Sequence, residues 1–369
     1  MRVLIWQWGR RGAGPRFAAS LADAIDHVQG AEALLSLSNG AEILAEPGIR
    51  CDLPIDTYSN VPGLLARFAI APLTIGDLSK KLSMLRPDVA ICAMPGPLDL
   101  LMLAALHRNR MPAVVIVHDA DAHPGDDVPL LMPLQRRLTR RADAVVALSS
   151  HVANRLREQG LAREGRLFVL PHPPFFYGPP PPAPLAHGGK LRLLCFGRLL
   201  PYKGLDLLAA AVASLAPVPG WELRVVGSGP ESAALAALRA LPSVAVENRW
   251  VPEHEVGALI AWADALVLPY REASQSGIAP AALAAGRFVV STRVGGLIEQ
   301  LQGEPRALLC DPDAASLAET LRTLLATAPH RPPPAPRDPR AVWQDAAALL
   351  LGHIRRAFAP DVAASAVLR

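Results

Sequence analysis

The chain has 369 residues, of which 51% are hydrophobic, so it can form large cores and is not generally disordered. At roughly 100–200 residues per domain, this length indicates about two domains. The 37 basic and 33 acidic residues leave a formal net charge of +4, which does not favour nucleic acid as a partner. Because no apolar run reaches the roughly 18 residues of a membrane-spanning helix, we expect no such helix.

The four cysteines are far apart and show no Cys-x-x-Cys spacing, which predicts neither disulfides nor a structural metal site. Cys92 and Cys195 lie within apolar runs, so we expect buried thiols in a reducing compartment. Residues 1–6 form too short an apolar segment for a signal peptide. We therefore expect a cytoplasmic protein that binds no metal.

Short apolar runs alternate with helical patterns along the chain. The expected strands of the first half are 2–6, 89–93, 113–118, 144–148 and 167–170. Those of the second half are 191–196, 222–226, 244–247, 265–268 and 288–291. Continuously apolar runs are typical of parallel strands covered on both faces, and the segments 205–215 and 256–263 show the apolar spacing of helices. We therefore expect two doubly wound, Rossmann-like α/β domains, whose ligands bind beyond the carboxyl ends of the strands.

Proline accounts for 37 residues and is concentrated in two segments. The segment 171–184 has eight prolines in 14 residues, and repeated proline removes amide donors and favours an extended chain. We therefore expect a linker at 171–190 between a first domain, 1–170, and a second domain, 191–340. The other cluster, 331–340, precedes a last helix that we expect at 341–358.

The second half contains three polar segments that follow expected strands. In the first, Arg198 and Lys203 form a basic pair that can bind an anion, and Gly197 lets the backbone approach it, although both cations also suit a solvated turn. In the second, Gly227 and Gly229 precede a helix whose amides can bind phosphate, although a tight turn needs the same glycines.

The third segment is a polar loop at 269–280 after an expected strand. Glu272, Gln275 and Ser276 offer hydrogen-bonding groups for sugar hydroxyls, and Gly277 leaves room for a ligand; a capped loop is the alternative. In the second half, the candidate residues for binding a ligand are Gly197, Gly227, Gly229, Val251, Ser274, Gln275, Ser276 and Gly277.

In order and spacing, these segments resemble the donor-binding half of family-four glycosyltransferases of the GT-B fold. That family shows G-R-x-x-x-x-K-G, V-G-x-G, a loop with glutamate, a G-x-P-V-V-like strand and V-G-G. The matching segments here are 197–204, 226–229, Glu272, 286–290 and 294–296. Weaker similarity covers 147–152 and 169–173, and Trp343, Leu349, Leu350, Ile354 and Phe358 resemble the family's final helix, which crosses back to the first domain.

The resemblance implies an enzyme that moves a hexose from a nucleoside diphosphate sugar to a hydroxyl of a glycan or a polyprenyl-diphosphate-linked oligosaccharide. It implies that Arg198 and Lys203 bind the diphosphate, whose negative charge grows as the glycosidic bond breaks, without a metal or other cofactor. Glu272 corresponds to the first of two glutamates in the family loop, and Ala281 stands in place of the second, which binds ribose. We therefore expect Gln275 and Ser276 to replace some of those contacts.

The first half is expected to bind the acceptor. The loop after the first strand offers four candidate acceptor-binding residues, Arg11, Gly12, Gly14 and Arg16, although a basic surface loop would look the same. In the family, a histidine at the end of a strand points toward the transferred sugar. This implies that His118, with Asp119 beside it, contacts a sugar hydroxyl or assists proton transfer, the alternative being a satisfied strand-end histidine.

The densest basic run, 136–141, joins apolar residues at 130–138 to form an amphipathic basic helix. This pattern suits an anionic membrane surface and predicts peripheral attachment to the inner face of the plasma membrane; a solvated helix face is the commoner explanation. Two rival functions remain open. One is a GT-B epimerase that acts on a nucleotide sugar, and the other is a catalytically inactive sugar-nucleotide-binding scaffold.

Overall fold

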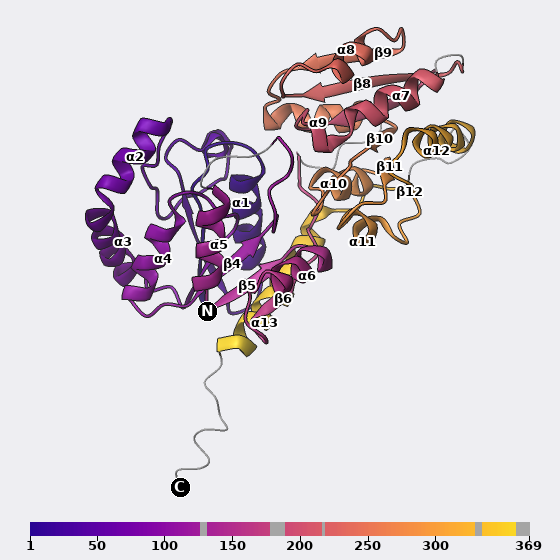
Figure 1. Cartoon of the computed structure of the whole chain (residues 1–369). Coiled ribbons are helices and arrows are strands. Elements are labelled where there is room, and N and C mark those ends of the chain that lie inside the picture. The colour runs from indigo at the N-terminus through magenta and orange to yellow at the C-terminus, as the bar shows by residue number, and fades with distance from the viewer. Residues whose placement is uncertain (126–130, 178–188, 216–217, 329–333, 359–369) are drawn as a thin grey trace.

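The computed structural model describes residues 1–125, 131–177, 189–215, 218–328 and 334–358. These residues form two α/β domains, each built on a six-stranded parallel sheet, that lie against each other (Figure 1). The expected GT-B-like architecture of two doubly wound domains is confirmed.

The first sheet has the strand order β2-β1-β3-β4-β5-β6. Its strands are β1 (Arg2–Gln7), β2 (Glu32–Leu37), β3 (Val89–Cys92), β4 (Ala113–Val117), β5 (Ala144–Ala147) and β6 (Leu167–Val169). The helices of this half are α1 (Ala13–Asp26), a 3-10 turn (Glu42–Ala45), α2 (Val61–Ala69), α3 (Ala71–Leu85), α4 (Asp99–Arg108), α5 (Leu131–Arg141) and α6 (Ser150–Glu158).

The second sheet has the strand order β12-β11-β10-β7-β8-β9. Its strands are β7 (Leu191–Phe196), β8 (Trp221–Gly227), β9 (Val244–Asn248), β10 (Ala265–Leu268), β11 (Phe288–Thr292) and β12 (Ala307–Cys310). The helices are a 3-10 turn, η2 (Pro201–Lys203), α7 (Leu205–Leu215), α8 (Ala233–Arg239), α9 (Glu253–Trp262), α10 (Ile278–Ala284), α11 (Leu297–Leu301) and α12 (Ala314–Thr327).

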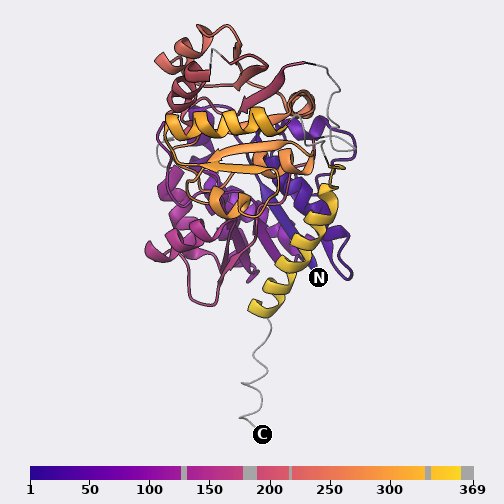
Figure 2. The ribbon, with the colours of Figure 1, turned by 90° about the vertical axis from the view of Figure 1, so that its right-hand side faces the viewer.

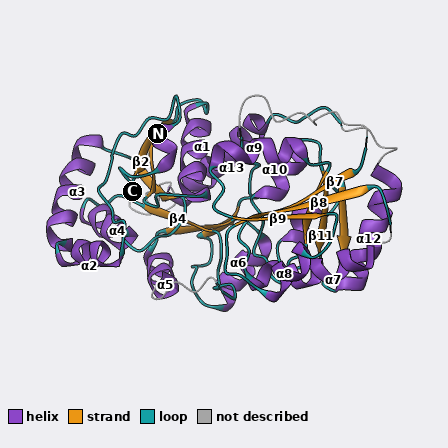
Figure 3. Cartoon of the chain, turned by 90° about the horizontal axis from the view of Figure 1, so that it is seen from above, coloured by secondary structure: helices purple, strands orange, loops and turns teal. Residues whose placement is uncertain are grey.

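Each sheet has a hydrophobic core on both of its faces. Figure 3 shows from above the helices that lie on either side of the strands. In β1, Val3 and Ile5 belong to one core, and Leu4 and Trp6 belong to the other. This two-sided burial explains why the strands are continuously apolar, and the expected burial of Cys92 and Cys195 is confirmed.

Helix α13 (Pro339–Phe358) completes the core of the first domain although it follows the second domain in sequence. Figure 2 shows it running from the second domain along the side of the first. Trp343 packs against Phe17 with a ring-centroid distance of 5.0 Å, and its Nε1 donates to the Pro174 carbonyl at 2.8 Å. Leu349, by contrast, is exposed and packs against neither domain core.

The first part of the proline-rich segment is packed inside the protein. Residues 172–175 are buried, and Phe175 is 4% exposed within the core of the first domain. The rest of the expected linker, 178–188, lies outside the described residues, as do 331–333 of the second cluster. The described part of this segment therefore contributes to the core of the first domain as well as connecting the two domains.

Helices α2 and α3 form an apolar edge at the side of the first domain that is remote from the second (Figure 1). Val61, Leu65, Leu73 and Met84 are all more than 60% exposed.

Among the described residues, no single helix has the length and hydropathy needed to cross a membrane. The bent pair α2 and α3, at 74° to each other, reaches these values only when the two helices are taken together.

Candidate functional site

The carboxyl ends of strands from both sheets face a cavity of about 650 Å³ between the two domains. The residues from the candidate set that line it are Arg11, Gly12, His118, Asp119, Gly197, Arg198, Lys203, Gly227, Val251, Gln275, Ser276 and Gly277. The candidates outside the lining are Gly14, Arg16, Gly229, Glu272 and Ser274. Most of the predicted residues therefore lie around one cavity, although they come from distant parts of the chain.

The floor of the cavity on the second-domain side depends on close backbone packing between β7 and β8. Gly197 follows β7 with a φ of 132°, a conformation that other residues rarely adopt. A Cβ on Gly227 would lie 1.7 Å from the carbonyl oxygen of Gly197. Gly229 has a similar structural role, because its amide donates to Asn248 Oδ1 at 3.1 Å and a Cβ there would meet the Leu199 carbonyl.

Aromatic rings position the two predicted cations at this floor. Arg198 donates from a terminal guanidinium nitrogen to the Tyr202 hydroxyl at 2.9 Å. Lys203 Nζ lies 3.6 Å from the centre of the Tyr270 ring and 4.8 Å from that of Tyr202. Cation–π contacts of this kind hold positive charge in place. Arg198 and Lys203 therefore present two fixed positive charges to the cavity.

The loop after β10 contributes a hydrogen-bond acceptor to the cavity. Gln275 Oε1 is buried and has no hydrogen-bond partner within the described part of the chain. A buried acceptor without a partner is costly, and a ligand hydroxyl would satisfy it. Next to it, the Ser276 amide donates to Gln300 Oε1 at 2.8 Å, and a Cβ on Gly277 would lie 2.8 Å from the Phe175 ring.

Glu272 lies outside the lining of the cavity in this structure. Its exposed side chain extends toward the first domain, where Oε2 lies 3.6 Å from Nδ1 of His123. Ser274 is buried, and its carbonyl accepts a hydrogen bond from Ser149 Oγ at 2.9 Å. In this structure, therefore, both residues contact the first domain rather than the space of the cavity.

His118 lies at the end of β4 and is 4% exposed. Its Nε2 is 2.8 Å from the Ala93 carbonyl, and a carbonyl can only accept, so Nε2 carries the proton. Burial lowers the pKa of His118, although the bond to Ala93 and the charge of Asp119 oppose this. The ring is therefore neutral, which leaves Nδ1 as a hydrogen-bond acceptor, and His118 lines the cavity.

The glycine-rich loop behind β1 divides into two functional parts. Gly12, with a φ of 79°, and Arg11 line the cavity, and Arg11 also pairs with Glu42 at 2.8 Å. Gly14 lies outside the cavity lining and packs against Gln7, whose side-chain amide would lie 2.6 Å from a Cβ there. The first part of the loop therefore lines the cavity, and Gly14 does not.

Arg16, a candidate acceptor-binding residue, lies outside the lining of the cavity and pairs with the second domain. Its Nε donates to Glu253 Oε2 of α9 at 2.7 Å, and the same guanidinium pairs with Glu46 and contacts the Phe176 carbonyl. Its side chain is 12% exposed. The guanidinium is therefore committed to holding the two domains together.

Two aspartates of the loop after β4 face different partners. Asp119 Oδ1 lies 3.1 Å from Nε2 of His123. Burial alone would raise the pKa of Asp119, but hydrogen bonds from His123 and Ser274 outweigh it and hold the pKa below its ordinary value. Asp121 instead accepts from Arg155 at 2.9 Å.

Among the described residues, no group of three or more acidic, histidine or cysteine side chains could hold a metal ion.

The cavity lining includes residues that the sequence interpretation did not propose, among them His123 and Tyr202. His123 follows Asp119 by four residues, and Tyr202 lies inside the segment that carries Arg198 and Lys203. Their rings stack with a centroid distance of 4.6 Å and an interplanar angle of 14°. The one sequence signal for these residues is their position, because His123 lies close to Asp119 and Tyr202 lies close to Lys203.

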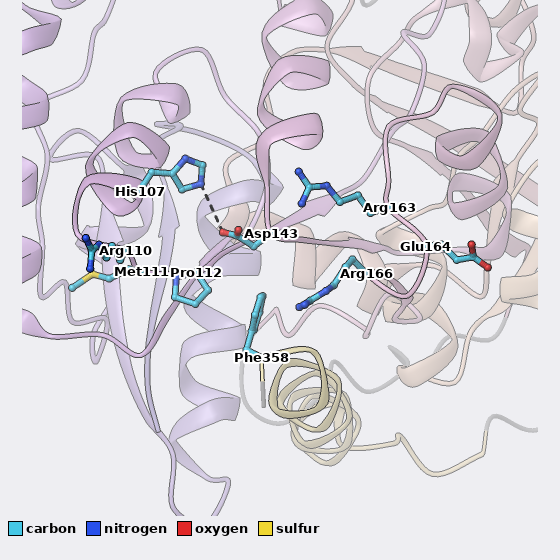
Figure 4. A pocket seen from close by; sticks show the side chains of 9 residues that line it. All are labelled: His107, Arg110, Met111, Pro112, Asp143, Arg163, Glu164, Arg166 and Phe358. Atoms are coloured by element: carbon cyan, nitrogen blue, oxygen red, sulfur yellow. Dashed lines mark ion pairs between the residues drawn. The ribbon is translucent and has the colours of Figure 1, made fainter. Parts of the chain in front are cut away.

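A second cavity, of about 510 Å³, lies at the opposite edge of the first sheet (Figure 4). It is lined by residues that precede β4, β5 and β6, and by Phe358 at the end of α13. His107 faces Asp143 there, with 3.7 Å between Nε2 and Oδ2. Since ligands of such sheets bind at the carboxyl ends of the strands, this cavity is not the candidate site.

Comparison with known proteins assigns both domains to one enzyme class. Residues 190–327 match the family model "Glycosyl transferases group 1", and residues 17–173 match "Glycosyltransferase Family 4". A curated relative, D-inositol 3-phosphate glycosyltransferase of Corynebacterium efficiens, is 36% identical over 140 residues, which are 35% of this chain and 33% of the relative. The match thus spans about a third of that relative's length.

Solved structures share the fold over nearly the whole chain. A glycosyltransferase from Rickettsia africae has a TM-score of 0.71 and 13% identity, covering 98% of this chain and 99% of that one. HepE of Anabaena, solved in complex with UDP and glucose, has a TM-score of 0.68 and 17% identity, covering 96% and 95%. Sucrose-phosphate synthase of Thermosynechococcus elongatus has a TM-score of 0.67 and 16% identity, covering 96% and 98%.

Proposed function

The chain belongs to the group 1 and family 4 glycosyltransferases of the GT-B fold, and we propose that it transfers a hexose from a nucleoside diphosphate sugar. The acceptor that we propose is a hydroxyl of a glycan or of a polyprenyl-diphosphate-linked oligosaccharide. The observation that supports this most directly is the pair of cations, Arg198 and Lys203, held by aromatic rings at the end of β7. Fixed cations there stabilise the negative charge that develops on the leaving nucleotide.

The sugar would lie between the cations and the first domain. Gln275 Oε1, which has no partner among the described residues, suits a sugar hydroxyl. His118 lines the opposite wall, and the Nδ1 of its neutral ring is able to accept a hydrogen bond. Ala281, which replaces the expected second glutamate, is buried in α10. We therefore propose that Gln275 and Ser276 take over part of the ribose or sugar recognition, and that no metal or other cofactor is required.

The donor that we would test first is a UDP-hexose, because HepE of Anabaena binds UDP and glucose with the same fold. The named activity of the Corynebacterium relative adds an inositol phosphate as a second acceptor to test. Arg11, which lines the cavity, would suit an anionic acceptor of either kind.

Peripheral contact with an anionic membrane, at the cytoplasmic face, is part of this proposal. Helix α5 provides Arg140 and Arg141 in its last turn, and the exposed apolar residues Leu65 and Leu73 lie on α2 and α3. Exposed apolar side chains and cations are the two features that bind such surfaces. Flotation with vesicles that contain anionic lipid should recover the protein, and Leu65→Ser with Leu73→Ser should reduce the recovery. Equal recovery with neutral vesicles would contradict a charge-dependent contact.

The experiment for the whole proposal uses the purified chain, a panel of radiolabelled nucleotide sugars, and either a membrane extract or an inositol phosphate as acceptor. Transfer of label to a lipid, glycan or inositol phosphate is the expected result. Interconversion of the free donor would indicate an epimerase instead. Donor binding without turnover in every combination would indicate an inactive scaffold.

A further inference from the structure

His123 of the first domain contacts three groups of the interdomain cleft. Its Nε2 lies 3.1 Å from Asp119 Oδ1 in its own domain, and its Nδ1 lies 3.6 Å from Glu272 Oε2 in the second domain. The face of the ring stacks on Tyr202, also in the second domain, at 4.6 Å. The side chain is only 11% exposed, so these groups form most of its surroundings.

The contact with Glu272 is not fully made in this structure. His123 Nδ1 is buried and has no hydrogen-bond partner within the described residues, because 3.6 Å to the carboxylate is too long for one. A buried polar atom without a partner is unfavourable. A small approach of the two domains would turn this near-contact into a hydrogen bond, so closure of the cleft would satisfy His123.

The stacked ring connects His123 to the proposed donor site. The hydroxyl of Tyr202 accepts from Arg198 at 2.9 Å, and its ring lies 4.8 Å from Lys203 Nζ. A side chain that fixes the Tyr202 ring therefore also restricts where Arg198 and Lys203 can lie. His123 is the first-domain residue that makes this contact across the cleft among those that the structure describes.

We propose that His123 is a positioning residue: when the cleft closes, its protonated ring hydrogen-bonds both Asp119 and Glu272 and holds Tyr202, so that Glu272 and Arg198 are correctly placed only in the closed enzyme. The effect on catalysis rests on the proposed glycosyl transfer, whereas the bridge itself is a property of the folded chain. Closure matters for such an enzyme because it excludes water, which would otherwise hydrolyse the donor.

The charges around the ring support a protonated state. Two ring nitrogens that both face carboxylates must both carry a proton to donate, which makes the imidazole a cation. The carboxylates are those of Asp119 and Glu272, and the opposing charge nearby is that of Lys203. Burial lowers the pKa of His123, but the hydrogen bond and charge of Asp119 and the nearby carboxylate of Glu272 outweigh it, so the pKa lies above the ordinary value. The cation that the bridge requires is therefore fully present below the ordinary pKa of histidine and is lost as the pH rises through the raised one.

The bridge can be tested without any enzyme activity. The Cε1–H resonance of His123 is followed by NMR as a function of pH in the wild type and in Glu272→Gln. The expected result is a titration midpoint above that of an ordinary histidine, which falls in Glu272→Gln. The matched control is Asp143→Asn, which removes the carboxylate partner of His107 at the far edge of the sheet and should leave His123 unchanged. A His123 midpoint that is the same with and without Glu272 would overturn the bridge.

The positioning role is tested with His123→Gln, which keeps a polar side chain but removes the cation. With a donor that the wild type uses, kcat should fall about 10- to 100-fold and donor hydrolysis should rise relative to transfer, because the reacting groups are misplaced. His107→Gln is the matched control and should keep the wild-type rate. Equal kcat and equal hydrolysis in His123→Gln and the wild type would overturn the role. If the wild type transfers no sugar at all, the proposed function fails, and the NMR titration still decides whether the bridge exists.

Discussion

Arg16 and Glu253 form an ion pair that joins the two domains, with 2.7 Å between Nε and Oε2. Arg16 belongs to α1 of the first domain, and Glu253 is the first residue of α9 in the second. Both side chains are less than 20% exposed, so little solvent screens the pair. Glu253 thus depends on the other domain for a compensating charge, whereas Arg16 also pairs with Glu46 of its own domain.

Removal of Arg16 should weaken domain association more than removal of the Glu253 charge. Arg16→Ala leaves Glu253 partly buried without its cation, which we expect to cost on the order of 3 kcal/mol of domain association. Glu253→Gln should cost less, because Arg16 keeps Glu46 and the Phe176 carbonyl as partners. Thermal unfolding and the radius of gyration from X-ray scattering would compare the two variants. An equal loss in both would contradict this ranking.

Replacement of Lys203 should abolish most transfer while leaving the fold intact. Lys203→Ala removes a positive charge that faces the cavity, and loss of a group that stabilises developing charge typically costs about 100-fold or more in kcat. Transfer from a radiolabelled donor measures the rate, and thermal unfolding checks the fold. Lys190→Ala is the matched control, because that exposed lysine lies at the other end of β7. A full rate in Lys203→Ala would refute the assigned role.

His172 should make the protein sensitive to acid. Burial among Phe17, Phe175 and His118 lowers its pKa from 6.5 to about 3, so it is neutral when folded. Between these two pH values the unfolded chain binds the extra proton, and the free energy of unfolding therefore falls as the pH drops, by up to about 1.4 kcal/mol per pH unit.

The measurement is urea unfolding between pH 7 and pH 4. His172→Phe should flatten the dependence on pH, whatever it does to the stability at pH 7. His27→Gln, at an exposed position after α1, should leave the slope of the wild type unchanged. Identical slopes in His172→Phe and the wild type would show that other groups cause the acid sensitivity.

Gly227 should not tolerate a side chain. A Cβ there would lie 1.7 Å from the Gly197 carbonyl oxygen, so Gly227→Ala must separate β7 from β8. We expect a loss on the order of 3 kcal/mol or failure to fold. Gly76→Ala, in α3 with nothing within 4 Å of the added Cβ, is the control and should be neutral or slightly stabilising. Denaturant unfolding of both variants measures the contrast, and equal stability would exclude the close approach.

The sequence was sufficient to predict most of the fold because parallel strands buried on both faces are short, continuous apolar runs. The two strands that it did not predict, β2 and β12, both lie at sheet edges. In β2, the buried Ser36 interrupts the apolar pattern and is satisfied by Trp8 and the Leu53 carbonyl, contacts that only the folded chain creates. In β12, three of the four residues are only partly buried, which weakens the apolar signal.

The sequence could predict site residues that lie in one continuous segment. It could not predict contacts between side chains of segments that are far apart in the chain. Arg198 and Lys203 share one short segment, and both line the cavity. The partners of Arg16 and of Glu272 come from the other domain, so no local pattern could indicate that Glu253 or His123 would face them. The residue types alone therefore do not distinguish side chains that contact a substrate from side chains that contact the other domain.

The position of α13 has a consequence for how the protein is made. Trp343 is 4% exposed in the core of the first domain, although the Pro174 carbonyl that it binds is 169 residues earlier. A nascent first domain therefore lacks part of its interior until the last helix leaves the ribosome. The segment from β7 to α12 is contiguous and can fold as it emerges. The half of the protein that is synthesised first is thus the half that finishes folding last.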